Sequence, residues 1–174
     1  MNRKKLSIFI FLLFILWIAV IFYFSSQPPG VSDSQSRMAV KIINKVNDLF
    51  DITDTKLYTK TTDIIKNIWL FNKYKTPNAV ARKSAHFGIY FILGIITSAF
   101  GYIYARKMLL GFLLGGSLPV VIAVLDEFNQ EFVGRTSSLS DVIIDGAGAL
   151  TGTIIIIFLI LLGKIINMVK GYIK

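Results

Sequence analysis

The hydrophobic residues of this chain fall into four long and nearly uninterrupted stretches, at residues 6–24, 85–105, 108–125 and 142–162. A helix needs about 20 mostly apolar residues to cross a bilayer, and each stretch comes close to that length. Strands of a membrane barrel would alternate apolar and polar positions, which these stretches do not do. The pattern therefore predicts an all-α integral membrane protein, with four transmembrane helices packed as one small bundle in a single domain over residues 1–174.

The long segment between the first two stretches, residues 25–84, has a different pattern. Its apolar residues recur at helical spacing in residues 42–50 and again in residues 64–69, with charged residues between them. Such patterns predict short amphipathic helices that lie on the bilayer surface or against the bundle. Pro28 and Pro29 mark a break after the first span. Thr76 followed by Pro77 is a typical helix start, so we expect the second span's helix to begin before the membrane.

Polar and ionisable residues gather where the second, third and fourth stretches meet the polar segments. Ionisable groups at membrane depth are costly, so they are candidates for function. The candidate ligand-binding side chains are Arg82, Lys83, His86, Tyr90, Asp126, Glu127, Gln130, Arg135, Asp141 and Asp145. In an enzyme, the catalytic candidates among them would be His86, Asp126, Glu127 and Asp145.

The length of a membrane crossing predicts that these residues lie at one level. Counting about 20 residues back from Arg106 reaches the neighbourhood of His86. The same count forward from Lys107 ends near Glu127, and back from Lys164 it ends near Asp145. We therefore expect one shared polar site at one boundary of the membrane.

Helical spacing groups the same residues by face. Lys83, His86 and Tyr90 follow one another at i, i+3 and i+7, so they share a face of one helix. Asp126 and Gln130 are four residues apart, and so are Asp141 and Asp145.

Each of these residues also has a purely structural alternative. Asp141, three residues after Ser138, has the form of a capping box. Asp145 could pair with Arg135, and His86 could be an ordinary interfacial histidine. Arg82 and Lys83 could be cations that anchor a span end by reaching to the interface.

Composition and charge narrow the function classes. The chain has 54% hydrophobic residues and a net charge of +9. Lysines and arginines flank the spans, as membrane topology requires, so we expect no nucleic-acid partner. The same rule predicts a multi-pass cell-membrane protein with both termini in the cytoplasm and residues 25–84 outside. The basic N-terminus resembles a signal peptide, but its apolar run is too long, so we expect a retained span.

The cysteine and histidine content bears on metal chemistry. The chain has no cysteine and only one histidine. Disulfides and thiolate metal sites are therefore excluded, and a zinc site is not expected. We predict no metal and no cofactor, although Glu127, Asp141 and Asp145 would be suitable oxygen ligands for Mg²⁺ or Ca²⁺ in an enzyme.

Several short motifs, taken in order, resemble one family. Residues 82–90 are similar to a K-x-x-H-F-x-x-Y segment, and Asp126-Glu127-x-x-Gln130 to a D-E-x-x-Q segment. Gly134-Arg135 with Asp141 is similar to G-R-x-x-x-x-x-D. Ser25-Ser26-Gln27-Pro28 is similar to an S-S-Q-P segment after the first span, which adds Ser25 and Gln27 to the candidate ligand-binding residues. These motifs together resemble the VanZ-like family. The resemblance implies a small bacterial cell-envelope membrane protein, and the family's founding member gives resistance to the glycopeptide teicoplanin.

Three functions are compatible with these observations. The leading hypothesis is a non-enzymatic protein that binds an envelope lipid, a cell-wall precursor or a lipoglycopeptide antibiotic at a polar site on the outer membrane face. The second is a membrane enzyme that acts on a lipid phosphate or envelope precursor, with His86 as acid or base. The third is a structural or transport bundle.

Overall fold

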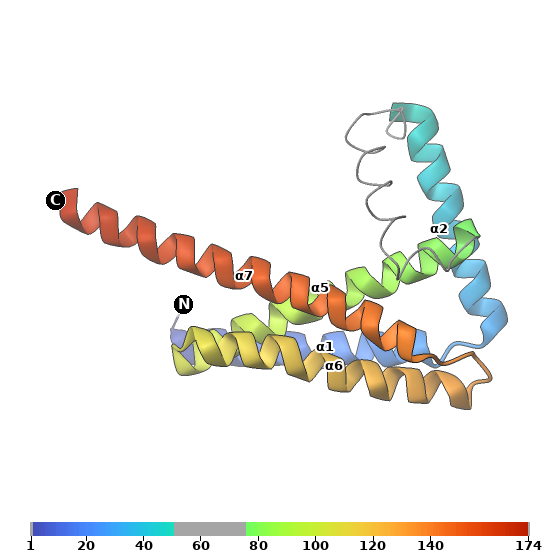
Figure 1. Ribbon diagram of the computed structural model, residues 1–174, viewed down its shortest axis with the longest axis horizontal. Helices are drawn as coiled ribbons and strands as arrows, with labels where there is room; N and C mark the ends of the chain where they lie inside the picture. The colour runs from blue at the N-terminus through green and yellow to red at the C-terminus, as the bar shows by residue number, and fades with distance from the viewer. Residues whose placement is uncertain (1, 51–75, 174) are drawn as a thin grey trace.

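The computed structural model describes residues 2–50 and 76–173, which form five helices (Figure 1). They are α1 (Arg3–Ser25), α2 (Pro29–Phe50), α5 (Pro77–Ala105), α6 (Met108–Phe132) and α7 (Leu139–Ile173). Four of them, all except α2, are long and apolar enough to cross a membrane. This confirms the predicted four-span all-α bundle and makes the chain a multi-pass membrane protein.

The helix ends follow local sequence signals. The Thr76 side chain accepts a hydrogen bond from the Ala79 N–H, and Pro77 begins α5 as expected. Arg106 adopts a left-handed conformation with φ of 58° and ends α5. After α6, Gly134 has φ of 74°, a conformation that glycine adopts without steric cost. These two turns reverse the chain, so α5, α6 and α7 lie antiparallel to their neighbours in sequence.

Helix α5 is the centre of the bundle and contacts each of the other four described helices. Two glycines of α7 allow the closest approach to α5. A Cβ atom on Gly148 would lie 2.3 Å from the Phe87 carbonyl oxygen, and one on Gly152 would lie 2.1 Å from that of Phe91. Small residues at such a contact let helix backbones pack directly in a membrane.

Helix α1 packs on the same core from the other side. Ile21 of α1 is buried with Leu93 of α5 and Ile122 of α6. The Trp17 indole N–H donates to the Ile89 carbonyl oxygen at 2.9 Å, which ties α1 to α5. Many of the remaining large apolar side chains of the spans point outward, as the lipid-facing surface of a membrane bundle requires.

One end of the bundle is rich in basic residues. The Arg3 side chain at the start of α1 donates to the carbonyl oxygens of Ile103 and Tyr104 at the end of α5. Lys164 of α7 lies 5.0 Å above the Tyr102 ring. The opposite end, where α1 and α6 finish and α5 and α7 begin, holds the buried ionisable residues.

Helix α2 follows α1 after the expected break and projects away from the four spans (Figure 1). It begins at Pro29, so it is longer than the amphipathic pattern of residues 42–50 predicts, and that pattern forms its second half. Its main contacts with the bundle are with α5. The second predicted amphipathic helix, at residues 64–69, lies outside the described residues.

Candidate functional site

The buried polar residues meet at the end of the bundle where four spans converge. Asp126, Glu127 and Gln130 lie in the last two turns of α6, and Lys83, His86 and Tyr90 lie on one face of α5. Asp141 and Asp145 lie on the first two turns of α7. These residues therefore lie together at one level of the bundle, as the counted span lengths predict.

Asp126 is held by two side chains. Its Oδ2 accepts a hydrogen bond from the Tyr90 hydroxyl at 3.0 Å, and its Oδ1 accepts one from the Gln130 amide at 3.2 Å. The Ser25 hydroxyl donates to the Asp126 backbone carbonyl at 3.2 Å, which joins the end of α1 to α6. The carboxylate is therefore fixed in position from both α5 and α6.

Asp145 pairs with His86 and not with Arg135. His86 Nδ1 lies 3.4 Å from Asp145 Oδ1. Asp145 is fully buried, and neither of its carboxylate oxygens has a hydrogen-bond partner in the part of the chain that the structure describes. The structural alternative of an Arg135–Asp145 pair is therefore wrong, and Asp145 faces the candidate site instead.

Asp141 and Glu127 connect α7 to its neighbours. Lys83 of α5 forms an ion pair with Asp141, and both side chains are buried. The Ser138 backbone N–H donates to Glu127 Oε2 at 2.8 Å. The acidic group that satisfies Ser138 thus comes from α6, whereas the capping-box pattern predicts Asp141 for that position.

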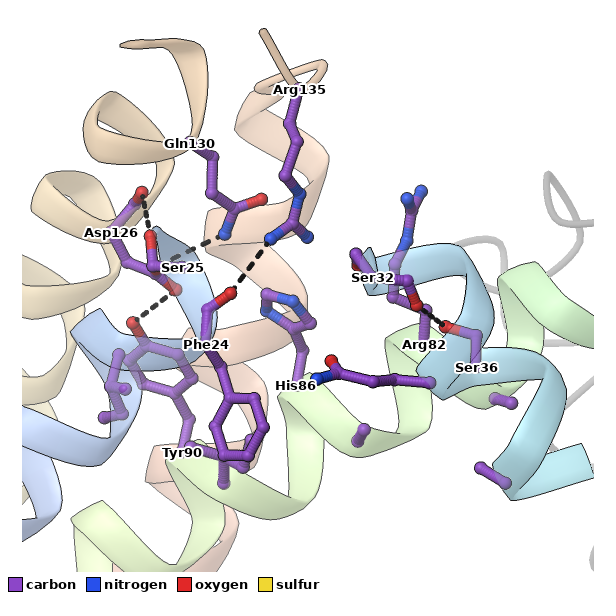
Figure 2. Close-up of a pocket in the computed structure, with 16 residues that line it drawn as sticks. Phe24, Ser25, Ser32, Ser36, Arg82, His86, Tyr90, Asp126, Gln130 and Arg135 are labelled. Carbon is purple, nitrogen blue, oxygen red and sulfur yellow. Dashed lines mark hydrogen bonds between the residues drawn. The ribbon is translucent and has the colours of Figure 1, made fainter. Parts of the chain in front are cut away.

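A cavity of about 300 Å³ opens beside these residues, between α1, α2, α5 and α6 (Figure 2). Its wall from α5 includes Arg82, His86 and Tyr90, and its wall from α6 includes Asp126 and Gln130. Apolar side chains such as Ile21 and Ile89 also line it. The cavity is thus partly apolar and partly polar.

Two arginines reach this cavity from different sides (Figure 2). Arg135 Nη1 donates to the Phe24 carbonyl oxygen across 3.4 Å, and its buried Nε has no hydrogen-bond partner among the described residues. Burial, together with the nearby positive charge of Arg82, lowers the pKa of Arg135, and the neighbouring carboxylates Asp126, Glu127 and Asp141 oppose that shift. An arginine stays protonated throughout the physiological range, so the cavity keeps both positive charges.

Comparison with known proteins gives a match over most of the chain. The family model for VanZ/LLP1 matches residues 9–162. The chain belongs to the VanZ/LLP1 family. No curated protein and no solved structure matches it significantly.

Of the site residues that the sequence of this VanZ/LLP1 protein predicts, the cavity wall includes Ser25, Arg82, His86, Tyr90, Asp126, Gln130 and Arg135. Lys83, Glu127, Asp141 and Asp145 do not line the cavity. Asp145 contacts its wall through His86, whereas Lys83 pairs with Asp141 and Glu127 accepts from the Ser138 N–H. Gln27 follows the end of α1 and does not line the cavity; its amide donates to the Tyr23 carbonyl oxygen at 3.1 Å.

Helix α2 of this VanZ/LLP1 chain supplies one wall whose residues are not among the candidate ligand-binding residues predicted from the sequence. Ser32, Gln35 and Ser36 line the cavity, and Ser36 Oγ donates to the Ser32 carbonyl oxygen at 3.0 Å. The signal that could have found them is their spacing, since positions 32, 35 and 36 fall on one face of a helix that begins at Pro29.

Proposed function

We propose that this VanZ/LLP1 protein binds the anionic head group of an amphiphile in the cavity between α1, α2, α5 and α6. An envelope lipid, a cell-wall precursor and a lipoglycopeptide antibiotic share this chemistry, because each joins an apolar chain to phosphate or carboxylate groups. The observation that carries the proposal is that Arg82 and Arg135 both line the cavity, and neither forms a salt bridge with a carboxylate of the described residues.

The pairing of the other charges supports this role for the arginines. Lys83 is paired with Asp141, and His86 contacts Asp145. The two guanidinium groups are therefore the cations left to meet a ligand at the cavity. Guanidinium groups bind phosphate and carboxylate through paired, charge-assisted hydrogen bonds, which are stronger than hydrogen bonds between neutral groups.

The size and the lining of the cavity suit a head group with the start of an acyl chain. A volume near 300 Å³ is at the lower end for small-molecule sites, so it would take a head group and not a whole lipid. Ile21, Phe24 and Ile89 offer an apolar surface to the adjoining chain. The Ser32 hydroxyl, on the wall from α2, could donate to a further oxygen of the head group.

The orientation that we propose places this cavity at the outer face of the membrane. The basic end of the bundle, with Arg3, Lys107 and Lys164, would lie in the cytoplasm under the positive-inside rule. About 20 helical residues separate Lys164 from Asp145, which corresponds to about 30 Å, the thickness of the hydrocarbon core. The cavity would then open near the outer head groups.

Lipid binding by the full-length protein tests the proposal. The protein would be reconstituted in nanodiscs of phosphatidylcholine, and the binding of short-chain phosphatidic acid and short-chain phosphatidylcholine would be measured by calorimetry. We expect the anionic lipid to bind at least tenfold more tightly. Arg82→Gln and Arg135→Gln should each weaken its binding about tenfold, because a hydrogen bond to a charged group contributes about 1.5–3 kcal/mol.

Arg37→Gln is the matched control, because Arg37 is exposed on α2 and does not line the cavity. It should leave binding unchanged. Equal affinity for the two lipids, or equal effects of Arg37→Gln and Arg135→Gln, would refute the proposal. A teicoplanin susceptibility assay of cells that express the wild type or Arg135→Gln, at matched protein levels, tests whether such binding gives resistance.

A membrane enzyme is the competing function, and the contact between His86 and the buried Asp145 is the observation that favours it. A carboxylate that orients a histidine is a common arrangement in acid–base catalysis. Mass spectrometry of the lipids after incubation with the wild-type protein would reveal a dephosphorylated product in that case. Binding with full recovery of the intact lipid would instead support the non-enzymatic role.

A further inference from the structure

Asp145 is the site carboxylate with the fewest hydrogen bonds among the described residues. Its side chain has no exposure, and neither oxygen has a hydrogen-bond partner among the described residues. Its closest charged contact is His86 Nδ1, at 3.4 Å from Oδ1. A buried carboxylate normally needs hydrogen bonds, a cation or a metal ion, because the loss of water around it is costly.

Among the buried side chains that the structure describes, acidic groups outnumber basic ones. Among the described residues, the buried acidic side chains are Asp126, Glu127, Asp141 and Asp145, whereas the only buried basic one is Lys83. Lys83 pairs with Asp141. The buried carboxylates that remain are Asp126, Glu127 and Asp145, and the partly buried basic side chains beside them include His86 and Arg135.

Three possible ligand atoms lie near one another at this place. His86, Asp126 and Asp145 each offer a ligand atom, and all three atoms lie within 4.8 Å of one another. The separation of 3.4 Å between His86 Nδ1 and Asp145 Oδ1 is longer than a good hydrogen bond. It is close to the distance of about 3.3–3.5 Å between two ligands that lie 2.0–2.2 Å from a tetrahedral ion.

We propose that His86, Asp126 and Asp145 form a binding site for one divalent transition-metal ion at the inner wall of the cavity. One imidazole nitrogen with two carboxylate oxygens suits Zn²⁺ or Mn²⁺ better than Mg²⁺, which prefers all-oxygen ligands. The sequence argues against a zinc site because it has one histidine and no cysteine. This site needs only that one histidine, since the carboxylates come from two other helices.

The contacts of Asp126 resemble the outer shell of a metal site. The Tyr90 hydroxyl and the Gln130 amide each donate to one of its oxygens, and this leaves a further lone pair on each oxygen. Hydrogen-bonded partners of this kind orient ligating carboxylates and strengthen metal binding. His86 and Asp126 both line the cavity, so remaining coordination positions of the ion would face it.

Metal binding by the purified full-length protein tests this proposal. The protein in detergent would be treated with EDTA, dialysed and titrated separately with ZnCl₂, MnCl₂ and MgCl₂ by calorimetry, and its metal content would be measured by mass spectrometry. We expect about one equivalent of Zn²⁺ or Mn²⁺, and binding of Mg²⁺ at least tenfold weaker. Asp145→Asn and His86→Ala should abolish this binding, and Tyr90→Phe should weaken it about tenfold or more.

The exposed Asp33 on α2 offers the matched control, because Asp33→Asn removes a carboxylate that is not part of the cluster. It should leave the stoichiometry and affinity unchanged. The wild type alone also decides the question if the variants fail to fold. Absence of saturable Zn²⁺ and Mn²⁺ binding to the folded wild type would overturn the proposal, and so would a folded Asp145→Asn that binds as the wild type does.

These titrations use no lipid, so they are independent of anion binding. Arg82→Gln and Arg135→Gln should retain the metal even where they lose the anionic lipid. If the wild type shows lipid selectivity but binds no metal, only the metal-site proposal is refuted. If the wild type binds metal but shows no lipid selectivity, only the proposed function is refuted.

Discussion

Lys83 and Asp141 form a buried ion pair that joins α5 to the first turn of α7. Lys83 is 3% exposed and Asp141 is 7% exposed, so both charges are largely removed from water. An ion pair at such a position contributes little net stability compared with apolar residues, but removal of one partner is strongly destabilising. The pair therefore fixes how α7 meets α5 beside the cavity.

Asp141→Ala should lower the free energy of unfolding by about 3 kcal/mol, because it leaves the Lys83 ammonium buried without this carboxylate. Unfolding of the purified protein in mixed detergent micelles, followed by circular dichroism, measures the change. The double variant Lys83→Met with Asp141→Leu should be more stable than Asp141→Ala alone. The single variants Lys83→Met and Asp141→Leu complete the comparison. If the double variant loses as much free energy of unfolding as these two single variants lose together, the residues are not coupled.

Glu127 fixes the turn between α6 and α7 through its hydrogen bond to the Ser138 N–H. Glu127→Ala should speed amide hydrogen exchange in residues 136–140 at least fivefold, since the loss of this partly buried hydrogen bond costs about 1–3 kcal/mol. Mass spectrometry of peptides from the exchanged protein measures it. Glu131→Ala, one turn further along α6 and exposed, is the control and should leave this exchange unchanged.

Glu127→Gln should restore slow exchange, because the amide oxygen can accept the same hydrogen bond. Fast exchange in this variant would show that the charge of Glu127, and not its hydrogen bond to Ser138, holds the turn.

Most of the fold could be predicted from the sequence because membrane spans leave a strong signal. Each span is a long apolar run, and the Thr76-Pro77 start and the Gly134 end of the helices depend only on local residues. The length of α2 could not be predicted in the same way. Its first half, from Pro29, is mostly polar, so the apolar pattern of residues 42–50 does not extend to it.

The polar site could be predicted as a group, but its pairings could not. The counted span lengths bring His86, Glu127 and Asp145 to one level, because the rise per residue of a helix is constant. The rotation of α7 about its axis decides that Asp145 meets His86 and that Asp141 meets Lys83. That rotation is set by tertiary contacts such as the one at Gly148, which a single sequence does not contain.

Close packing of α5 and α7 makes Gly152 sensitive to the smallest substitution. A Cβ atom there would lie 2.1 Å from the Phe91 carbonyl oxygen, so the backbones would have to separate. Gly152→Ala should lower the free energy of unfolding by about 1–3 kcal/mol. Gly163→Ala, in the same helix with nothing within 4 Å of its Cβ position, should leave stability unchanged or slightly higher. Equal stabilities in the same detergent unfolding assay would contradict this packing.

The proposed orientation predicts the accessibility of the two ends of the bundle. The chain has no cysteine, so single cysteines can be introduced without further change. Ser137→Cys lies in the exposed turn between α6 and α7, near the cavity, and Lys107→Cys lies exposed at the opposite end of α6. A membrane-impermeant maleimide should label Ser137→Cys in intact cells.

The same reagent should label Lys107→Cys only after the membrane is permeabilised, because the α5–α6 turn would lie in the cytoplasm with the other basic residues. Labelling after permeabilisation confirms that both cysteines are reactive. The reverse pattern would place the cavity at the cytoplasmic face. In that case the anionic ligand would have to come from the inner leaflet or the cytoplasm, and a cell-wall precursor or an antibiotic outside the cell could not reach Arg82 and Arg135.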